Sequence, residues 1–409
     1  MKIFIKTFGC RVNQVESQAI LEGLEAQNHA ITANLKEADL CLLNTCSVTH
    51  KADRDVEREI RRIIKENPKA KLIISGCYAM SHKEEISQKF PTATTVFKAD
   101  LDKYLFEREI DWSITRHQGH SRAFVKIQDG CDNFCAYCIV PYTRPNKTSK
   151  PMQTVVEEVK NLVASGQSEI VLTGINIGNY HCPETGADLA ALLPKLFAIE
   201  GNFRLRFSSI EANTITPALI EAAASAKDKF CNYFHIPLQS GSDAVLKAMG
   251  RHYTTAKYLA KLAEIRAKIK GVSIYCDIIA GYPTETEEDF KNSIDFVKQA
   301  GFAGLHVFSY SARKGTPASA LKQLPAAEIK KRAEMLRSLD KELRQKFAKS
   351  LINTTQQFLA EEYLQEKNQT SGVLANFQRV IIENAPKKEG LSQVKITSAK
   401  AGICYAKYI

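Results

Sequence analysis

The stretch Cys131-Asp-Asn-Phe-Cys135-Ala-Tyr137-Cys138 places three thiols within eight residues. It follows residues 123–129, which we interpret as a β-strand. Three thiolates so close in sequence can converge on one metal centre. A tetrahedral zinc site needs four ligands, often from two C-x-x-C pairs, and no fourth ligand lies nearby. Three thiolates suit an iron–sulfur cluster that keeps one iron open, and a zinc loop is the alternative.

The overall composition is that of a globular protein with metal-binding cysteines. The chain has 409 residues, enough for two or three domains, and a formal charge of +11. That charge favours a polyanionic partner such as nucleic acid, although a merely basic cytosolic protein would carry it too. Eleven cysteines, some closely spaced, indicate metal binding in a reducing compartment. No apolar run approaches the ~18 residues of a membrane helix, so we expect a cytoplasmic protein without a membrane partner.

Residues 1–115 have the pattern of an α/β domain with a parallel sheet. Its predicted strands are 2–7, 39–44 and 71–75, and its helices are 14–27 and 51–66. Each strand is followed by a cysteine, namely Cys10, Cys46 and Cys77. Because the carboxyl ends of parallel strands share one edge, these three thiols can meet despite their separation in sequence. Cys41 lies inside its strand and is interpreted as core packing.

Residues 122–345 alternate between strand and helix patterns after a polar linker at 116–121. Six such units predict a curved parallel sheet or partial barrel, with chemistry on the loops that follow the strands. The predicted strands are 124–128, 169–173, 204–208, 233–237, 273–279 and 305–309, and helices include 155–164 and 287–299.

The tail, residues 352–409, changes to short β patterns after a charged helical stretch at 328–349. These patterns, at 356–363, 377–383, 391–397 and 403–408, predict a small β domain. The remaining cysteines stand alone in the sequence and are interpreted as structural: Cys182, Cys231, Cys276 and Cys404.

The three-cysteine stretch, with Tyr137 before its last cysteine, resembles the C-x-x-x-C-x-aromatic-C signature of the radical S-adenosylmethionine (SAM) enzymes. The resemblance implies a (β/α)6 partial barrel. It also implies a 4Fe–4S cluster on Cys131, Cys135 and Cys138, the catalytic cysteines. In that family the open iron binds SAM, and an electron from the cluster cleaves SAM to a 5′-deoxyadenosyl radical.

Residues 7–17, 44–49 and 75–79 look like the amino-terminal motifs of the methylthiotransferases, radical-SAM enzymes that insert a thiomethyl group into a C–H bond. The resemblance implies a second 4Fe–4S cluster on Cys10, Cys46 and Cys77 that carries or delivers the sulfur. It further implies a tRNA partner, and an electron donor such as a flavodoxin or ferredoxin. The tail would be a small C-terminal β-barrel that binds RNA, called a TRAM domain, although a β cap without an RNA role is the alternative.

The same resemblance implies SAM contacts on the loops after the strands. Taken singly, a loop stretch such as Gln-Ser-Gly-Ser is more often a turn with a helix cap than a ligand site. The support for SAM contacts therefore comes from the order in which these loops follow one another along the chain. The implied cofactor-binding residues are Tyr137, Gly174, Asn176, Ser209, Glu211, Gln239 and Ser240.

Three positions depart from the family pattern. Arg144-Pro145 stands where Arg-Gly is usual, Ser149-Lys150 replaces Ser-Arg, and Thr284 replaces a glycine. Proline fixes φ and lacks an amide donor, and lysine does not reproduce the fork of an arginine. These changes leave the cysteines intact but put the loop geometry and any phosphate contact of this segment in doubt.

A cationic stripe is expected on the predicted helix 51–66. Its members recur at helical spacing and make one face: Arg54, Arg58, Arg61, Arg62 and Lys65. We hypothesise that this face contacts tRNA phosphates. A solvated face with ion pairs inside the helix is the alternative.

The amino-terminal motifs look most like the branch that acts on N6-threonylcarbamoyladenosine, with methylthiolation at C2 of the nucleoside at tRNA position 37. Its threonylcarbamoyl group carries a carboxylate, so its pocket needs a cation or amide donors, and Arg11 or Arg144 could supply the cation. The alternatives are methylthiolation of isopentenyladenosine in tRNA or of a ribosomal protein side chain, and a non-catalytic iron–sulfur protein that binds RNA.

Overall fold

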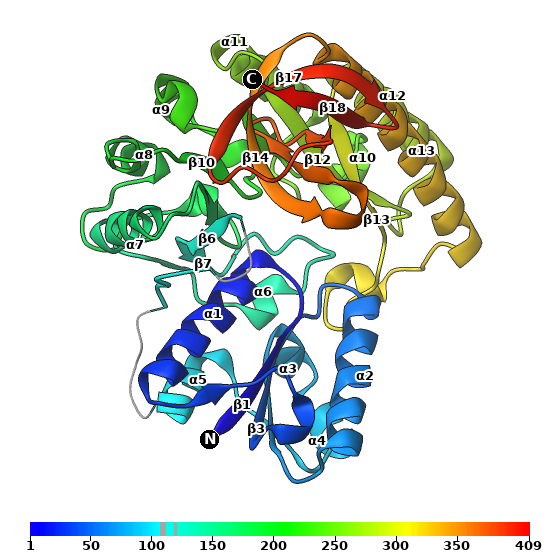
Figure 1. Ribbon diagram of the computed structural model, residues 1–409. Helices are drawn as coiled ribbons and strands as arrows, with labels where there is room; N and C mark the ends of the chain where they lie inside the picture. The colour runs from blue at the N-terminus through cyan, green and yellow to red at the C-terminus, as the bar shows by residue number, and fades with distance from the viewer. Residues whose placement is uncertain (107–111, 118–120) are drawn as a thin grey trace.

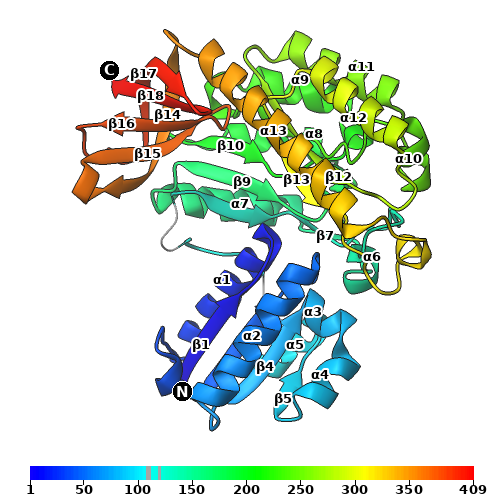
Figure 2. The same ribbon diagram turned by 90° about the vertical axis from the view of Figure 1, so that its right-hand side faces the viewer.

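The computed structural model describes residues 1–106, 112–117 and 121–409. Three units follow one another along the chain, an N-terminal parallel sheet, a curved parallel sheet and a closed β-barrel (Figure 1). The first and last units pack at separate places on the middle one, as Figure 2 shows. Residues 118–120 of the predicted linker lie outside the described residues. This architecture confirms the predicted fold class.

The N-terminal sheet is parallel, with the strand order β2-β1-β3-β4-β5. Its central strand β3 is buried throughout, as its continuous apolar run predicts. Helices α1 and α5 cover one face, and α2, α3 and α4 cover the other. The strands are β1 Lys2–Thr7, β2 Ala30–Ile31, β3 Leu40–Thr45, β4 Lys71–Gly76 and β5 Ala93–Thr95. The helices are α1 Arg11–Ala26, α2 His50–Glu66, α3 Cys77–Ser81, α4 Lys83–Lys89 and α5 Lys98–Phe106.

The middle unit is a six-stranded parallel sheet in the order β6-β9-β10-β11-β12-β13. Single parallel bridges, such as Ser209 with His235, join its two halves. The strands are β6 Ala123–Lys126, β9 Glu169–Thr173, β10 Arg204–Phe207, β11 Tyr233–His235, β12 Ser273–Ala280 and β13 Gly304–Ser309. The helices are α6 Val140–Thr143, α7 Met152–Ala164, α8 Leu189–Phe197, α9 Pro217–Ser225, α10 Asp243–Ala248, α11 Thr255–Lys268, α12 Glu287–Ala300 and α13 Ala326–Ser350.

The outer helices bury their apolar stripes against the convex face of this sheet in one continuous core. A short antiparallel pair, β7 Gln128–Asp129 with β8 Thr148–Ser149, flanks the three-cysteine loop. The predicted partial barrel is therefore present, and its open concave face is available to the other two units.

The C-terminal unit is a closed barrel in the order β14-β15-β16-β18-β17. Register shifts in β14 and β17 bend these long strands, as closure requires. Strand β15 was not predicted, because its first half, Gln369-Thr-Ser-Gly372, lacks apolar alternation. Gly372 fits there because a Cβ would lie 2.7 Å from the Phe358 ring. The strands are β14 Thr355–Leu364, β15 Gln369–Leu374, β16 Arg379–Glu383, β17 Leu391–Lys400 and β18 Ile403–Tyr408.

A buried charge cluster docks this barrel on the concave face of the middle sheet. Arg204 and Arg206 on β10 are fully buried, and each places Nε 2.7 Å from a carboxylate oxygen of Glu169. Their remaining donors reach backbone carbonyl oxygens of the barrel, those of Val373 at 3.2 Å and Ala375 at 3.0 Å. Burial alone would raise the pKa of Glu169, but the two guanidinium groups hold it well below its usual range. The cluster thus neutralises Glu169 and ties the two units together.

Within the described part of the chain, no helix combines the length and the apolar character needed to cross a membrane.

We expect Glu169→Gln to lower the free energy of unfolding by about 3–5 kcal/mol, because it leaves two buried guanidinium groups without a counter-charge. Urea titration monitored by circular dichroism measures the change. The control is Glu37→Gln, which breaks an exposed pair with Lys2 at 2.9 Å and should leave the free energy of unfolding nearly unchanged. Equal costs for the two variants would contradict the docking role of the cluster.

Candidate functional site

Cys131, Cys135 and Cys138 lie on one loop between β7 and α6, at the carboxyl edge of the curved sheet. The loop is fixed by backbone hydrogen bonds, including Cys138 N to the Cys135 carbonyl oxygen at 2.9 Å. Burial, together with the charges of Cys135 and Cys131, raises the pKa of the Cys138 thiol to about 12. Three thiols therefore share one small region, and this donor set fits a cluster with one open iron.

Cys10, Cys46 and Cys77 gather at the carboxyl ends of β1, β3 and β4. Two glycines with positive φ permit the close approach. A Cβ on Gly9 would lie 2.6 Å from the Cys46 sulfur, and one on Gly76 would lie 2.7 Å from the Thr45 nitrogen. Burial raises the pKa of Cys46 to about 11, with further contributions from Cys77 and Cys10. The structure thus brings these thiols to one sheet edge.

A cavity of about 190 Å³ lies between the two groups of cysteines. From the middle unit it is lined by Cys138, Tyr137 and residues of β12 and β13. From the N-terminal unit it is lined by Val48 and Thr49, which follow Cys46 closely. A molecule held there would contact Cys138 directly and the loop that follows Cys46.

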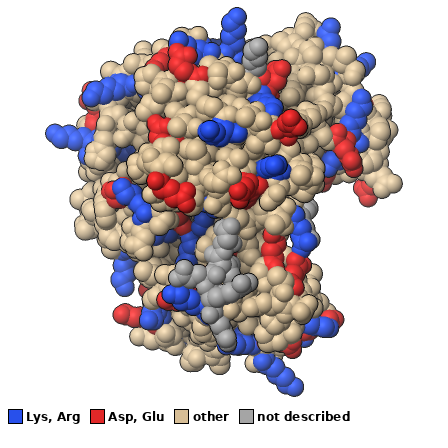
Figure 3. Space-filling model, turned by 90° about the vertical axis from the view of Figure 1, so that its left-hand side faces the viewer, with Lys and Arg blue, Asp and Glu red and all other residues tan. Residues whose placement is uncertain are grey.

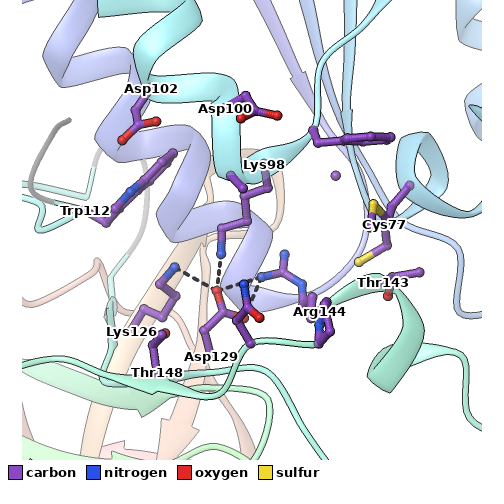
Figure 4. Close-up of a pocket in the computed structure, with 16 residues that line it drawn as sticks. Cys77, Lys98, Asp100, Asp102, Trp112, Lys126, Asp129, Thr143, Arg144 and Thr148 are labelled. Carbon is purple, nitrogen blue, oxygen red and sulfur yellow. Dashed lines mark hydrogen bonds and ion pairs between the residues drawn. The ribbon is translucent and has the colours of Figure 1, made fainter. Parts of the chain in front are cut away.

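A buried ion network holds the two units together beside a second cavity, which Figure 4 shows. Arg144 of the cysteine loop donates from Nη1 to Glu16 at 2.9 Å and to Asp129 at 2.8 Å, and from Nη2 to Asn13 at 2.8 Å. Lys126 lies 3.0 Å from Glu16, which comes from helix α1. Because α1 begins directly after Cys10, this network fixes one group of cysteines relative to the other.

The charges of the network compensate one another. Burial alone would raise the pKa of Glu16, but Arg144, Lys98 and Lys126 hold it well below its usual range. Asp129 is held low in the same way by the same three cations. Lys98 from α5 lies 2.5 Å from Glu16 and also pairs with Asp129. Both carboxylates therefore remain ionised inside the interface.

The network also corrects the hypothesis that Arg144 faces a substrate carboxylate. Both terminal nitrogens of its guanidinium are bound by Glu16, Asp129 and Asn13, so its charge is already neutralised. Arg144 does line a cavity of about 370 Å³ together with Cys77, as Figure 4 shows. Its role there is to join the two units.

Arg313, on the loop after β13, forms a second link to the N-terminal unit. Its Nη1 lies 2.6 Å from Asp53 and 3.2 Å from the carbonyl oxygen of Ser47, and its Nη2 lies 2.5 Å from His50 Nδ1. Since Ser47 follows Cys46, this arginine fixes the loop that carries the second of the gathered thiols.

Asn176 has the geometry expected of a ligand contact. It is 3% exposed, and both Oδ1 and Nδ2 are buried without a hydrogen-bond partner. Its backbone nitrogen donates to Gln128 Oε1 at 2.8 Å, which fixes the loop. Gly174 allows this approach, because a Cβ there would lie 2.8 Å from the Gln128 carbonyl oxygen. An unsatisfied buried amide is costly, so this group fits a polar cofactor such as SAM.

Glu211 is connected to the cysteine loop through an arginine that sequence analysis missed. Arg251 pairs with Glu211, and its Nη1 lies 3.4 Å from the sulfur of Cys135. The segment Gly250-Arg251-His252 has no local motif that would have identified this residue. Ser209 lies two residues before Glu211 and is partly exposed at the same edge.

Gln239 and Tyr137 line the cavity next to Cys138, whereas Ser240 does not. Gln239 has a positive backbone φ of 72°, and this conformation sets the direction of the connection between two strands. The Ser240 side chain is buried against α12, with its Oγ 3.3 Å from the Ser293 hydroxyl. The predicted SAM contact of Ser240 is therefore wrong for its side chain, which packs inside the fold.

The departures from the family pattern have structural explanations. Lys150 lies 2.6 Å from Glu158 and 3.0 Å from the Ser113 hydroxyl, so its ammonium group is bound within the protein. Thr284 is an exposed turn residue without a positive φ, so a glycine is not required there. Pro145 occupies the wall of the larger cavity.

Arg11 is an unpaired cation among the described residues. It begins α1, stacks over the Phe124 ring at 5.6 Å and has no carboxylate within 4.0 Å in the described part of the chain. Phe124 lies on β6 of the curved sheet, so Arg11 extends from the N-terminal unit toward the middle one. Burial lowers the pKa of Arg11.

The cationic stripe of α2 exists, but much of its charge is compensated. Arg58, Arg61 and Arg62 form ion pairs within the helix at 2.9 to 3.1 Å. This is the alternative expected from the sequence, and the contact with tRNA phosphates stays a prediction. On the face in Figure 3, likewise, positive and negative side chains are interspersed.

Known families account for most of the chain. The pattern of the uncharacterized protein family UPF0004 matches residues 2–98, and that of the Radical SAM superfamily matches residues 125–297. The radical SAM methyltransferase TsrM from Kitasatospora setae has the same fold, with a TM-score of 0.58 at 13% identity. That match covers 78% of this chain and 77% of TsrM.

Two relatives align over nearly the whole sequence. Threonylcarbamoyladenosine tRNA methylthiotransferase MtaB of Bacillus subtilis is 33% identical, over 98% of this chain and 94% of the relative. The tRNA-2-methylthio-N(6)-dimethylallyladenosine synthase of Cereibacter sphaeroides (strain ATCC 17023) is also 33% identical, over 97% of this chain and 96% of the relative.

A curved parallel sheet with a three-cysteine loop at its carboxyl edge defines a radical-SAM enzyme. Together with the full-length relatives, it shows that the chain belongs to the radical-SAM tRNA methylthiotransferase family. Membership implies SAM, a 4Fe–4S cluster and a tRNA substrate.

We expect Arg144→Met to loosen the N-terminal unit from the middle one, because Glu16 and Asp129 lose their shared buried partner. The free energy of unfolding should fall by about 3–5 kcal/mol. Hydrogen exchange should accelerate in α1 and in the loop at residues 131–138. The control is Arg58→Met, whose side chain is 78% exposed and pairs only with Asp55. Unchanged exchange in α1 would contradict the linking role of Arg144.

Proposed function

We propose that this protein adds a methylthio group to C2 of N6-threonylcarbamoyladenosine at tRNA position 37. The observation that supports it most is that the two docked units each carry a three-thiol group at a sheet edge, and that Cys138 of one group lines a cavity together with Val48 and Thr49, which follow Cys46 of the other. One group would serve radical formation and the other would hold the sulfur to be transferred. Two molecules of SAM would be used, one to methylate sulfur and one to form the radical.

Cys131, Cys135 and Cys138 would hold the cluster that binds SAM. The open iron would take the amino and carboxylate groups of SAM, and the unsatisfied amide of Asn176 is placed on a neighbouring loop to bind SAM as well. Glu211 would contact the ribose, with Arg251 holding its carboxylate near Cys135. Tyr137, Gly174, Ser209 and Gln239 complete the proposed SAM site at the same sheet edge.

Cys10, Cys46 and Cys77 would hold a second 4Fe–4S cluster. Their sulfurs come from three strand ends, and Cys77 lines the cavity of about 370 Å³, which would leave room for a sulfur atom beside that cluster. Iron must displace protons from thiols such as Cys46, whose pKa lies near 11, so cluster assembly would release protons.

The two-cluster proposal predicts about eight irons per chain after anaerobic reconstitution, because each 4Fe–4S cluster contains four. Replacing Cys131, Cys135 and Cys138 together by Ala should leave about four irons and abolish SAM cleavage. The same change at Cys10, Cys46 and Cys77 should leave about four irons and SAM cleavage but no methylthiolated product.

Iron analysis and liquid chromatography of 5′-deoxyadenosine provide the measurements. Cys41→Ala is the matched control, because Cys41 is a buried cysteine of β3 and should leave the iron content unchanged. Wild-type protein that binds about four irons would show the proposal of two clusters to be wrong.

The choice of the threonylcarbamoyl substrate rests on charge. Arg11 is a half-buried cation with no ion-pair partner in the described part of the chain. A carboxylate on the substrate would provide that partner, whereas an isopentenyl group would not. The dimethylallyladenosine substrate is the second candidate, because the relative from Cereibacter sphaeroides is equally identical to this chain.

Reactions on two tRNAs decide between these substrates. We expect product on tRNA with N6-threonylcarbamoyladenosine and none on tRNA with isopentenyladenosine, since the second would leave Arg11 unpaired. Arg11→Met should raise KM for the first tRNA by tenfold or more, as expected for the loss of a charged hydrogen bond. Arg337→Met, an exposed arginine of α13 outside the cationic stripe of α2, is the control. Product only on the isopentenyl tRNA would overturn the substrate proposal.

The remaining roles are proposals that follow from the family. Residues 1–115 would form the methylthiotransferase domain, residues 122–345 the radical-SAM core, and residues 352–409 the TRAM-like domain that binds RNA. The barrel fold of the last segment supports its part of this division. A flavodoxin or ferredoxin would supply the electron, and the protein would work in the cytoplasm.

A further inference from the structure

Three polar side chains meet on the concave face of the curved sheet and have no role in the proposals above. His235, Asp277 and His306 come from the adjacent strands β11, β12 and β13. His235 Nε2 lies 2.7 Å from Asp277 Oδ1, and His306 Nδ1 lies 3.3 Å from the same oxygen. One carboxylate oxygen therefore orients both imidazoles.

The arrangement fixes which ring nitrogen of His306 is available to a ligand. Burial alone would raise the pKa of Asp277, but His235 and His306 hold it well below its usual range, so the carboxylate is ionised and accepts hydrogen bonds only. Nδ1 of His306 must then carry its proton toward Asp277. Nε2 has no hydrogen-bond partner among the described residues, and the side chain is 36% exposed. In the imidazolium form, Nε2 is a second donor.

The cluster borders the cavity between the two groups of cysteines. Asp277 lines that cavity together with Cys138 and Gln239. Phe308, two residues beyond His306 on the same strand, lines it as well. His306 is not itself a lining residue, but it lies 3.3 Å from Asp277, which lines the cavity, and so stands beside it.

We propose that His306 is a specificity residue that donates from Nε2 to an oxygen of the threonylcarbamoyl group, with Asp277 and His235 as its positioning residues. This inference rests on the proposed function. Because Nδ1 carries a proton toward Asp277, donation from Nε2 requires the imidazolium form, and the adjacent carboxylate stabilises that form. Arg11 and His306 would then bind the modification from the N-terminal and middle units.

The three ligand atoms lie within 4.8 Å of one another, so a divalent cation is the competing occupant. We favour the hydrogen-bonded cluster, since Nε2 of His235 and Oδ1 of Asp277 already form a hydrogen bond of 2.7 Å.

The test compares two tRNAs that differ only at position 37, one with N6-threonylcarbamoyladenosine and one with unmodified adenosine. His306→Ala in the reconstituted enzyme should weaken binding of the first by tenfold or more and leave binding of the second unchanged. His306→Gln, which keeps an amide donor, should recover part of the loss. His29→Ala, in the N-terminal unit beside β2, is the control.

Three results would overturn the proposal. Equal loss of affinity for both tRNAs would assign His306 a structural role. If both His306 variants still distinguish the two tRNAs as the wild-type enzyme does, His306 takes no part in recognising the modification. A stoichiometric divalent metal, bound by the wild-type holoenzyme and lost in His306→Ala, would make the cluster a metal site. If wild-type enzyme makes no product from the threonylcarbamoyl tRNA, the proposed function itself fails, and this is seen before any variant is measured.

Discussion

The buried contact of Arg144 with Glu16 and Asp129 is the constraint on which the arrangement of this enzyme depends. It joins the loop of Cys131 to the helix that begins after Cys10. Burying five charged side chains is costly unless they are paired, and here three cations surround two carboxylates. The geometry of the interface is therefore specific, because a displaced N-terminal unit would leave charges without partners.

The position of the cavity beside Cys138 follows from this docking. Arg144 and Arg313 hold the N-terminal unit at two points, one beside Cys10 and Cys77 and the other beside Cys46. In a methylthiotransferase the radical and the sulfur must reach the same carbon atom, so the distance between their sites has to be fixed before substrate binds. SAM and the iron–sulfur chemistry supply reactivity, and the protein supplies position and a cavity with few exposed polar groups.

A second buried cluster supports the opposite end of the curved sheet. Glu169, Arg204 and Arg206 join the C-terminal barrel to the strands that lead toward the site. Between the two clusters, His235 and Asp277 line the concave face with His306. The interior of the sheet is thus polar along much of its length, which suits a nucleotide better than an apolar substrate.

Local sequence determined the cysteine groups, the strand and helix order and the family. Cysteine spacing, apolar periodicity and strand-end glycines depend on neighbouring residues, and they appear in the structure close to the predicted bounds. Only the tertiary structure showed that Arg144 belongs to the interface, that Arg251 reaches Cys135, and that His306 shares a carboxylate with His235. These contacts join residues far apart in the chain, such as Arg144 and Glu16 at a separation of 128 residues. Their partners depend on how the strands are ordered and how the units dock, which a single sequence does not encode locally.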